Sequence, residues 1–325
     1  MTDPYAEYIR ILGRGPTKSR HLTREEAHFA FSGVLSGKMA DMQVGALLLL
    51  WRYRSESPAE LAGIVAAIRD HITFDQLQDH NDIIDWPSYS SGKSRRLPWF
   101  LLSAKLLAEN DIKIFMHGFN SHLENGLLTE DCLAAVGEEP VASLAEARKR
   151  LDKGNFAYLP LRNFCPKLQE LLEIRSVLGV RSIVNTAVKL VNPLEAKLTF
   201  LGIFHPAYIT LNVAAAELLK QPSLGVIKGG GGEAERNILK PIKLYQIAEG
   251  EQQVSKWPSL AAEKPDYPVT SGYLADIWQG KQEDDYATNM IVGTAAQALY
   301  LTGRAKTVDQ AEKLALEYWQ KHLEA

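Results

Sequence analysis

The stretch Leu224-Gly-Val-Ile-Lys-Gly-Gly-Gly-Gly-Glu233 joins a short apolar run to four consecutive glycines. A run of this length that ends in glycines is typical of a strand in an open α/β sheet, where ligands bind at the carboxyl ends of the strands. Glycines at that place let the backbone approach a ligand closely. The alternative is a flexible loop that binds nothing.

Similar apolar runs recur between helical segments from about Asp82 onward, and they predict βα units around a mostly parallel sheet. The expected strands are Ile83–Asp85, Ile112–Met116, Phe156–Leu159, Phe200–Phe204, Leu224–Ile227 and Lys243–Ile247. Helices are expected over residues 97–110, 286–302 and 308–323. Residues 255–285 are rich in Pro, Gly, Lys and Asp, and we expect them to be irregular.

The first quarter of the chain predicts consecutive helices, because helix-start signals precede apolar residues at helical spacing. Thr23 and Glu26 form one capping box, Ser57 and Glu60 form another, and Asp41 is expected to cap a helix between them. We expect two domains: an N-terminal helical bundle over residues 1–75, completed by helices from about 140–190, and an α/β domain over residues 76–325. The expected fold class is α/β, with a helical bundle domain beside a mostly parallel sheet flanked by helices.

Length and charge exclude several classes of protein. The 325 residues suffice for about two domains, and the 46% apolar and 23% charged fractions exclude disordered and collagen-like chains. The formal net charge of −3, from 36 Lys and Arg against 39 Asp and Glu, excludes a polycation of the histone kind. Any anion site must therefore be local.

Two cysteines, Cys132 and Cys165, are too few for a disulfide framework or a four-cysteine zinc site, so we expect buried free thiols in a reducing compartment. The longest apolar run, Val44–Trp51, is far shorter than the ~20 residues that cross a bilayer. We expect a cytoplasmic protein that makes no membrane contact.

Three further motifs contain side chains that suit anion binding or catalysis. Residues 88–96 combine hydroxyl side chains, a glycine and three cations between a strand and a helix, which suits an anion, although a solvated basic turn has the same composition. His117-Gly118 ends a strand as either a general base or a hydrogen-bonded structural residue. Arg175 and Arg181 either cap helices or bind phosphate bidentately.

Several of these segments together resemble a known family. Leu22–Ala27, Leu35–Gly37, Ser57–Gly63, Leu178–Ser182 and Phe204-His205-Pro206 look like segments of anthranilate phosphoribosyltransferases and the related class II nucleoside phosphorylases, which share the glycosyltransferase family 3 fold. The resemblance runs from about residue 10 to residue 320. It implies a helical domain beside an α/β domain, in a homodimer formed through the helical domain.

The catalytic signatures of that family are altered here. Its G-T-G-G-D loop for phosphoribosyl pyrophosphate corresponds to Ser88-Tyr89-Ser90-Ser91-Gly92, and its K-H-G-N survives only as His117-Gly118. Its H-G-x-G-x-D-E, whose two acids hold magnesium, becomes Lys228-Gly229-Gly230-Gly231-Gly232-Glu233-Ala234. Metal ions and backbone donors supply most of the stabilisation in such a transfer, so we expect no catalytic residues, no metal and no cofactor.

The altered pattern is similar to the YbiB-like paralogues of this enzyme, through Pro87-Ser88-Tyr89, His117-Gly118, Phe164-Cys165-Pro166 and Lys228–Glu233. That resemblance implies a homodimer that has lost anthranilate phosphoribosyltransferase activity and binds single-stranded DNA or RNA with little sequence preference. Tyr89 or Phe119 would offer a stacking face. The cations expected to contact the phosphate backbone are Lys93, Arg95, Arg96, Arg175, Arg181, Lys228, Arg236, Lys240 and Lys243.

Two alternatives stay open. The retained His117-Gly118, Glu233 and glycine run also fit an active phosphoribosyl or glycosyl transferase that uses phosphoribosyl pyrophosphate and Mg²⁺ with a different acceptor. The second alternative is a protein that binds some other phosphorylated metabolite.

Overall fold

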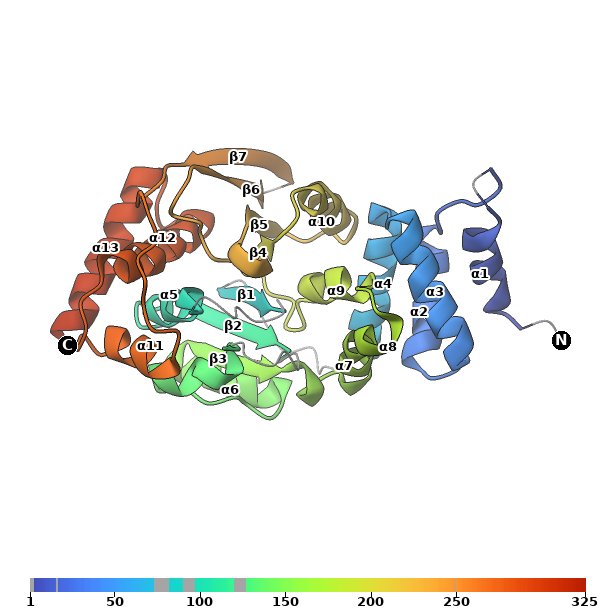
Figure 1. Ribbon diagram of the computed structural model, residues 1–325, viewed down its shortest axis with the longest axis horizontal. Helices are drawn as coiled ribbons and strands as arrows, with labels where there is room; N and C mark the ends of the chain where they lie inside the picture. The colour runs from blue at the N-terminus through green and yellow to red at the C-terminus, as the bar shows by residue number, and fades with distance from the viewer. Residues whose placement is uncertain (1–2, 16, 73–81, 90–96, 120–126, 249) are drawn as a thin grey trace.

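A seven-stranded sheet forms the centre of the molecule (Figure 1). The computed structural model describes residues 3–15, 17–72, 82–89, 97–119, 127–248 and 250–325. The strands are β1 (Ile83–Ser88), β2 (Lys113–Gly118), β3 (Phe156–Pro160), β4 (Leu198–Ile203), β5 (Ser223–Lys228), β6 (Ile242–Ala248) and β7 (Glu251–Trp257). Their order is β3-β2-β1-β4-β5-β6-β7; the pairs from β3 to β5 are parallel, and β6 and β7 add antiparallel strands at one side.

The six expected strands are confirmed, whereas β7 is a strand that the sequence did not predict. Because β7 is an edge strand, six of its seven residues, from Glu251 to Lys256, are exposed or only partly buried. Most of them are polar, so the segment lacks the apolar alternation that signals a strand. The expectation of an irregular segment over residues 255–285 is also partly wrong. The helix α11 (Ser271–Trp278) begins there, where the Thr270 side chain accepts a hydrogen bond from Tyr273 N–H.

Helices cover both faces of the sheet. The face that carries Ile84 and Trp86 packs against α5 (Trp99–Ala108), α12 (Asp285–Leu301) and α13 (Val308–Glu324), with the short helix η1 (Glu130–Val136) in the same core. The other face packs against α6 (Leu144–Gly154) and α10 (Ala207–Leu218). The three helices expected from the sequence over residues 97–110, 286–302 and 308–323 are confirmed as α5, α12 and α13.

The N-terminal bundle consists of α1 (Ala6–Gly13), α2 (Arg24–Leu35), α3 (Asp41–Arg54) and α4 (Pro58–His71). Both expected capping boxes are present, at Thr23 before α2 and at Ser57 before α4. The expected cap at Asp41 is wrong, because Ala40 occupies the cap position and its N–H donates to Gln43 Oε1.

Helices from the middle of the chain lie beside this bundle (Figure 1). They are α7 (Pro166–Glu173), α8 (Arg175–Leu178) and α9 (Val184–Ala187), and α4 contacts both α9 and α10. Arg69 of α4 donates from Nε to the Val191 carbonyl at 2.8 Å and from Nη2 to the Leu190 carbonyl at 3.0 Å. One continuous apolar core joins the bundle to the α10 face of the sheet, so the two parts are held together by packing as well as by hydrogen bonds.

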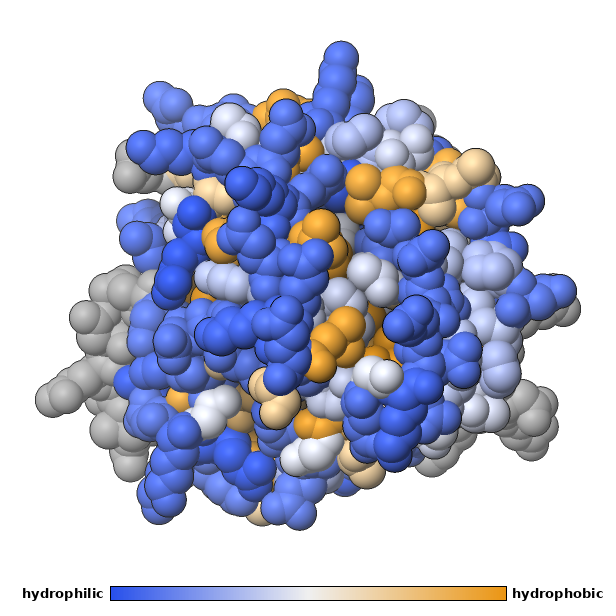
Figure 2. Space-filling view, turned by 90° about the vertical axis from the view of Figure 1, so that its left-hand side faces the viewer, coloured by the Kyte–Doolittle hydropathy of each residue, from blue (hydrophilic) through white to orange (hydrophobic). Residues whose placement is uncertain are grey.

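The expected state of the cysteines is confirmed, because Cys132 and Cys165 are buried free thiols. None of the helices in the described part of the chain is long and apolar enough to cross a membrane. The end of the molecule formed by α11, α12 and α13 presents a mostly hydrophilic surface with scattered apolar side chains (Figure 2).

Candidate functional site

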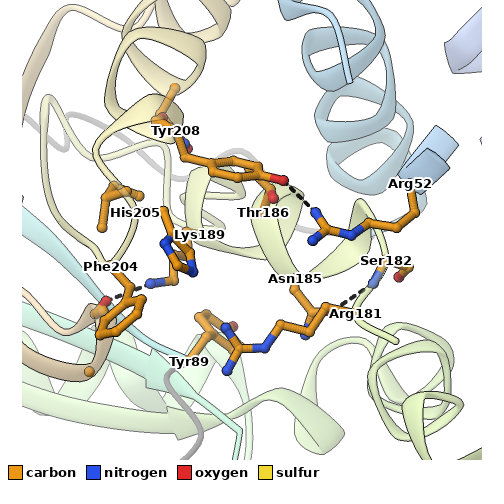
Figure 3. Close-up of a pocket in the computed structure, with 14 residues that line it drawn as sticks. Arg52, Tyr89, Arg181, Ser182, Asn185, Thr186, Lys189, Phe204, His205 and Tyr208 are labelled. Carbon is orange, nitrogen blue, oxygen red and sulfur yellow. Dashed lines mark hydrogen bonds between the residues drawn. The ribbon is translucent and has the colours of Figure 1, made fainter. Parts of the chain in front are cut away.

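A pocket opens at the carboxyl ends of β4 and β5, between the sheet and the helices beside the bundle (Figure 3). Its volume is about 130 Å³, roughly tenfold the ~10–15 Å³ that one water needs, so it accommodates a group of several heavy atoms. Parallel α/β sheets bind ligands at this edge. The lining residues are Arg52, Tyr89, Arg181, Ser182, Asn185, Thr186, Lys189, Ile203, Phe204, His205, Tyr208, Asn212, Gly231 and Gly232.

Basic side chains from three separate segments converge on the pocket. Arg52 comes from α3, Arg181 from the loop before α9, and His205 from the turn between β4 and α10. Arg52 donates to the hydroxyl of Tyr208, which in turn donates to Glu56 Oε2 at 3.4 Å (Figure 3). These contacts hold the Arg52 guanidinium at the rim of the pocket. Burial and neighbouring arginines lower the pKa of Arg181.

Lys189, in the short helix η3 (Val188–Leu190), supplies a fourth basic side chain from the floor of the pocket. Its Nζ donates to the Gly202 carbonyl at 2.7 Å and to the Gly232 carbonyl at 2.5 Å. Burial lowers the pKa of this amine to about 8, and Glu233 partly offsets that effect. Since an ammonium carries three N–H donors, one remains for a ligand.

The glycine run forms a tight loop, with η4 (Gly230–Gly232) directly after β5. Gly231 and Gly232 have φ of 70° and 92°, which favours glycine. A Cβ at Gly229 would lie 1.6 Å from the Glu233 carbonyl oxygen, so the loop packs too closely for any other residue. The Glu233 side chain is buried behind the loop and does not line the pocket.

A buried chain of hydrogen bonds sets the position of Tyr89. The Tyr89 hydroxyl lies 2.6 Å from His117 Nδ1, and His117 Nε2 lies 3.0 Å from Asp85 Oδ1. The side chains of His117 and Asp85 have 0% exposure, so the histidine acts as a structural support for the aromatic wall of the pocket. Burial, followed by the neighbouring groups Tyr158, Asp85 and Cys165, raises the pKa of Tyr89 well above its ordinary value, which keeps the hydroxyl protonated.

The structure brings some of the residues expected from the sequence to this pocket. Tyr89, Arg181, Gly231 and Gly232 line it. Lys228 and Lys243 are exposed on β5 and β6, whereas Arg175 and Lys240 are exposed on α8 and in the loop before β6. Ser88 is buried, with Oγ 2.8 Å from Thr129 Oγ1, and Gly118 is also buried; Phe119 packs against the core. Ser90, Ser91, Gly92, Lys93, Arg95 and Arg96 lie outside the described residues.

The expectation for Arg236 is corrected. Its side chain is fully buried, with Nη1 2.7 Å from Glu312 Oε1 and Nη2 2.6 Å from the Pro258 carbonyl. The guanidinium also stacks over the Trp257 ring, 5.0 Å from its centroid. A side chain enclosed in this way joins β7 and α13 and does not reach a ligand in the cleft.

Arg52, Lys189 and Tyr208 are pocket residues that the sequence did not reveal. Arg52 lies in the last turn of an apolar helix and Lys189 follows another apolar segment, so neither belongs to a local motif. His205 and Phe204 stand in a segment that carried the family resemblance, although the sequence did not mark either one as a site residue.

Known proteins resemble the whole chain. The model of the glycosyl transferase family helical bundle domain matches residues 6–72, and that of the glycosyl transferase family a/b domain matches residues 100–321. An anthranilate phosphoribosyltransferase of Aquifex aeolicus is 24% identical over 321 residues, which cover 96% of this chain and 94% of the relative. The uncharacterized protein YbiB of Escherichia coli is 29% identical over 208 residues, or 63% of this chain and 64% of YbiB.

A solved structure extends the likeness to the fold. The anthranilate phosphoribosyltransferase of Saccharomyces cerevisiae in complex with PRPP and Mg has a TM-score of 0.80 and 16% identity, over 100% of this chain and 97% of that one.

Proposed function

We propose that this chain binds single-stranded DNA or RNA with little sequence preference. It belongs to the glycosyl transferase family whose members contain a helical bundle domain and an a/b domain. One observation supports this proposal most strongly: three cations, Arg52, Arg181 and Lys189, face one pocket together with His205, and none of the described lining residues is a carboxylate. A cluster of cations without carboxylates attracts phosphate groups and repels metal ions.

Aromatic side chains accompany the cations. Phe204 is 50% exposed beside His205, and the rings of Tyr89 and Tyr208 line the same pocket. Bases stack on such rings regardless of sequence, because every base has a π-face. This combination of phosphate contacts and stacking favours binding without base readout.

We propose that anthranilate phosphoribosyltransferase activity is lost. The solved yeast relative holds PRPP with Mg, whereas here the Lys189 ammonium already bridges the carbonyls of Gly202 and Gly232. A divalent cation would be repelled by this ammonium and by Arg181, and it would find no carboxylate among the described lining residues. The residues present therefore do not fit a magnesium ion, and we derive no transfer step through one.

We also propose a homodimer formed through the helical bundle. Met42, Leu49 and Tyr53 are 87%, 41% and 89% exposed and lie seven and four residues apart on α3, which places them on one helix face. Exposed apolar side chains that share a face are typical of an interaction surface. Light scattering should give twice the chain mass for the wild type, and Leu49→Glu with Tyr53→Glu should give a monomer. A monomeric wild type would refute the dimer.

Fluorescence anisotropy with labelled oligonucleotides of several sequences tests the binding. We expect binding to all sequences, with an affinity that falls steeply with salt. Replacing Arg52 and Arg181 with Gln removes about two phosphate contacts, so the slope of log affinity against log salt should become shallower by about 1. Replacing Lys313 and Lys321 of α13 with Gln is the matched control, because both are exposed and distant from the pocket lining.

Two results would contradict the proposal. Absence of oligonucleotide binding at low salt would refute nucleic acid binding. Magnesium-dependent heat on titration with phosphoribosyl pyrophosphate, together with turnover of an acceptor, would instead establish the transferase reading.

A further inference from the structure

Three lysines lie side by side on the face of the sheet that α10 covers. Lys243 of β6 is the register partner of Lys256 of β7. Ile227 of β5 pairs antiparallel with Leu244 of β6, so the next position places Lys228 opposite Lys243. Residues opposite each other in an antiparallel pair share a face, and we call Lys228, Lys243 and Lys256 the lysine row.

The lysine row is costly for the isolated protein. Like charges that lie directly opposite on neighbouring strands are destabilising, and strands are about 4.8 Å apart. All three lysines are exposed, and none forms an ion pair within the part of the chain that the structure describes. An anion that bridges the ammonium groups would remove this repulsion.

Protection of the sheet edge does not account for the whole row. A lysine on an edge strand prevents pairing with another chain, which explains Lys256 on β7. Lys228 and Lys243 stand on strands that are paired on both sides, where no such protection is needed. Protection of the sheet edge therefore leaves Lys228 and Lys243 unexplained, whereas binding of an anion would account for all three lysines.

The lysine row continues from the pocket. Lys228 is the register partner of Ile203, which lines the pocket, and the half-exposed ring of Phe204 follows Ile203 directly. Three strand spacings separate Ile203 from Lys256, a path of about 14 Å. Figure 1 shows β5, β6 and β7 beside α10, whose first turn carries the pocket residue Tyr208.

We propose that the lysine row is a second phosphate-binding strip, which holds the part of a single strand that leaves the pocket past Phe204. This inference rests on the proposed function, because it concerns the same ligand. It adds that the binding site is longer than the pocket, so that affinity depends on oligonucleotide length.

The test compares the wild type with a row variant in which Lys228, Lys243 and Lys256 are all replaced with Ala. The matched control variant replaces Lys306, Lys313 and Lys321, three exposed lysines of the α13 region, with Ala. Binding of oligothymidylates of about 5 and about 20 nucleotides is measured by anisotropy over a range of salt concentrations. Circular dichroism and thermal unfolding verify the fold, and removing the repulsion should leave the row variant at least as stable as the wild type.

For the long oligonucleotide we expect the row variant to lose about 10- to 100-fold in affinity at ~0.1 M salt and its salt slope to become shallower by about 2, since three contacts are lost. The short oligonucleotide and the control variant should bind as in the wild type. If the row variant binds the long oligonucleotide as tightly as the wild type, the lysine row is not a phosphate-binding strip, and the proposed function is unaffected.

Two further outcomes separate the inferences. No binding of either oligonucleotide by the wild type refutes the proposed function and the row together. Loss of binding to vesicles rich in anionic lipid, with oligonucleotide binding unchanged, would assign the row to a membrane surface and overturn the inference.

Discussion

The protonation of Lys189 should control anion binding in the pocket. Burial lowers the pKa of this amine from an ordinary 10.5 to about 8, while its two hydrogen bonds hold it at the pocket floor. If only the charged amine attracts phosphate, raising the pH from about 7 to about 9 reduces the binding-competent fraction from about nine-tenths to about one-tenth. The apparent dissociation constant should therefore rise about tenfold.

The assay is anisotropy with a short oligonucleotide at constant ionic strength, for the wild type and Lys189→Met. The variant should bind more weakly at neutral pH and should lose the pH dependence over this range. His205→Gln is the control for the imidazole that lines the same pocket, and it should retain the dependence on pH. Calorimetry at about pH 8 in buffers of different ionisation enthalpy should detect uptake of about half a proton on binding.

The stability of the free protein provides an independent check. The unfolded chain keeps the Lys189 proton to a higher pH than the folded chain, so the free energy of unfolding should gain a positive contribution as pH rises from about 8 toward 10.5. Lys189→Met should abolish that contribution. Wild-type oligonucleotide binding that is independent of pH between about 7 and about 9, or a pH dependence that survives in Lys189→Met, would refute the reasoning.

Three further predictions concern other residues. Arg236→Met should lower the free energy of unfolding by about 3 kcal/mol, because the buried partner of Glu312 is removed. Chemical denaturation measures this loss, and the affinity for nucleic acid should be unchanged. A loss of affinity without a loss of stability would contradict the structural role. Glu60→Gln should cost about 2 kcal/mol, because the buried carboxylate of Glu60 accepts hydrogen bonds from several segments, and urea unfolding measures it; an unchanged midpoint would refute that role. Gly229→Ala should displace the loop, because the new Cβ would meet the Glu233 carbonyl, so oligonucleotide affinity should fall in anisotropy, whereas unchanged affinity would show that the loop is not part of the site.

Local patterns predicted most of the elements. The capping boxes at Thr23 and Ser57 depend on residues three apart, and the apolar runs of β1 to β6 depend on buried strands, so both are visible in a single sequence. The strand β7 escaped prediction because its hydrogen bonds to β6, and not its own composition, make it a strand. The Asp41 cap failed because the helix already begins at Asp41, so that Ala40 stands at the cap position and its N–H donates to Gln43 Oε1.

The candidate site was predicted less completely. The sequence indicated the glycine loop and Arg181, since both belong to recognisable segments at the ends of strands or helices. It did not distinguish Arg236 from an exposed cation, because the burial of Arg236 comes from Glu312 and Trp257, which are distant in sequence. Arg52 and Lys189 were missed for the converse reason, since only tertiary packing brings their segments to the pocket.

The sequence by itself determined the two-part α/β architecture and the family, because capping, apolar periodicity and family motifs are properties of short stretches of chain. Only the tertiary structure decided which basic side chains act together. Arg52, Arg181, Lys189 and His205 come from four segments that meet at one sheet edge, and the lysine row exists only in the register of β5, β6 and β7. The physical reason is that charge–charge energies depend on distance and burial, which the fold sets and the order of residues does not.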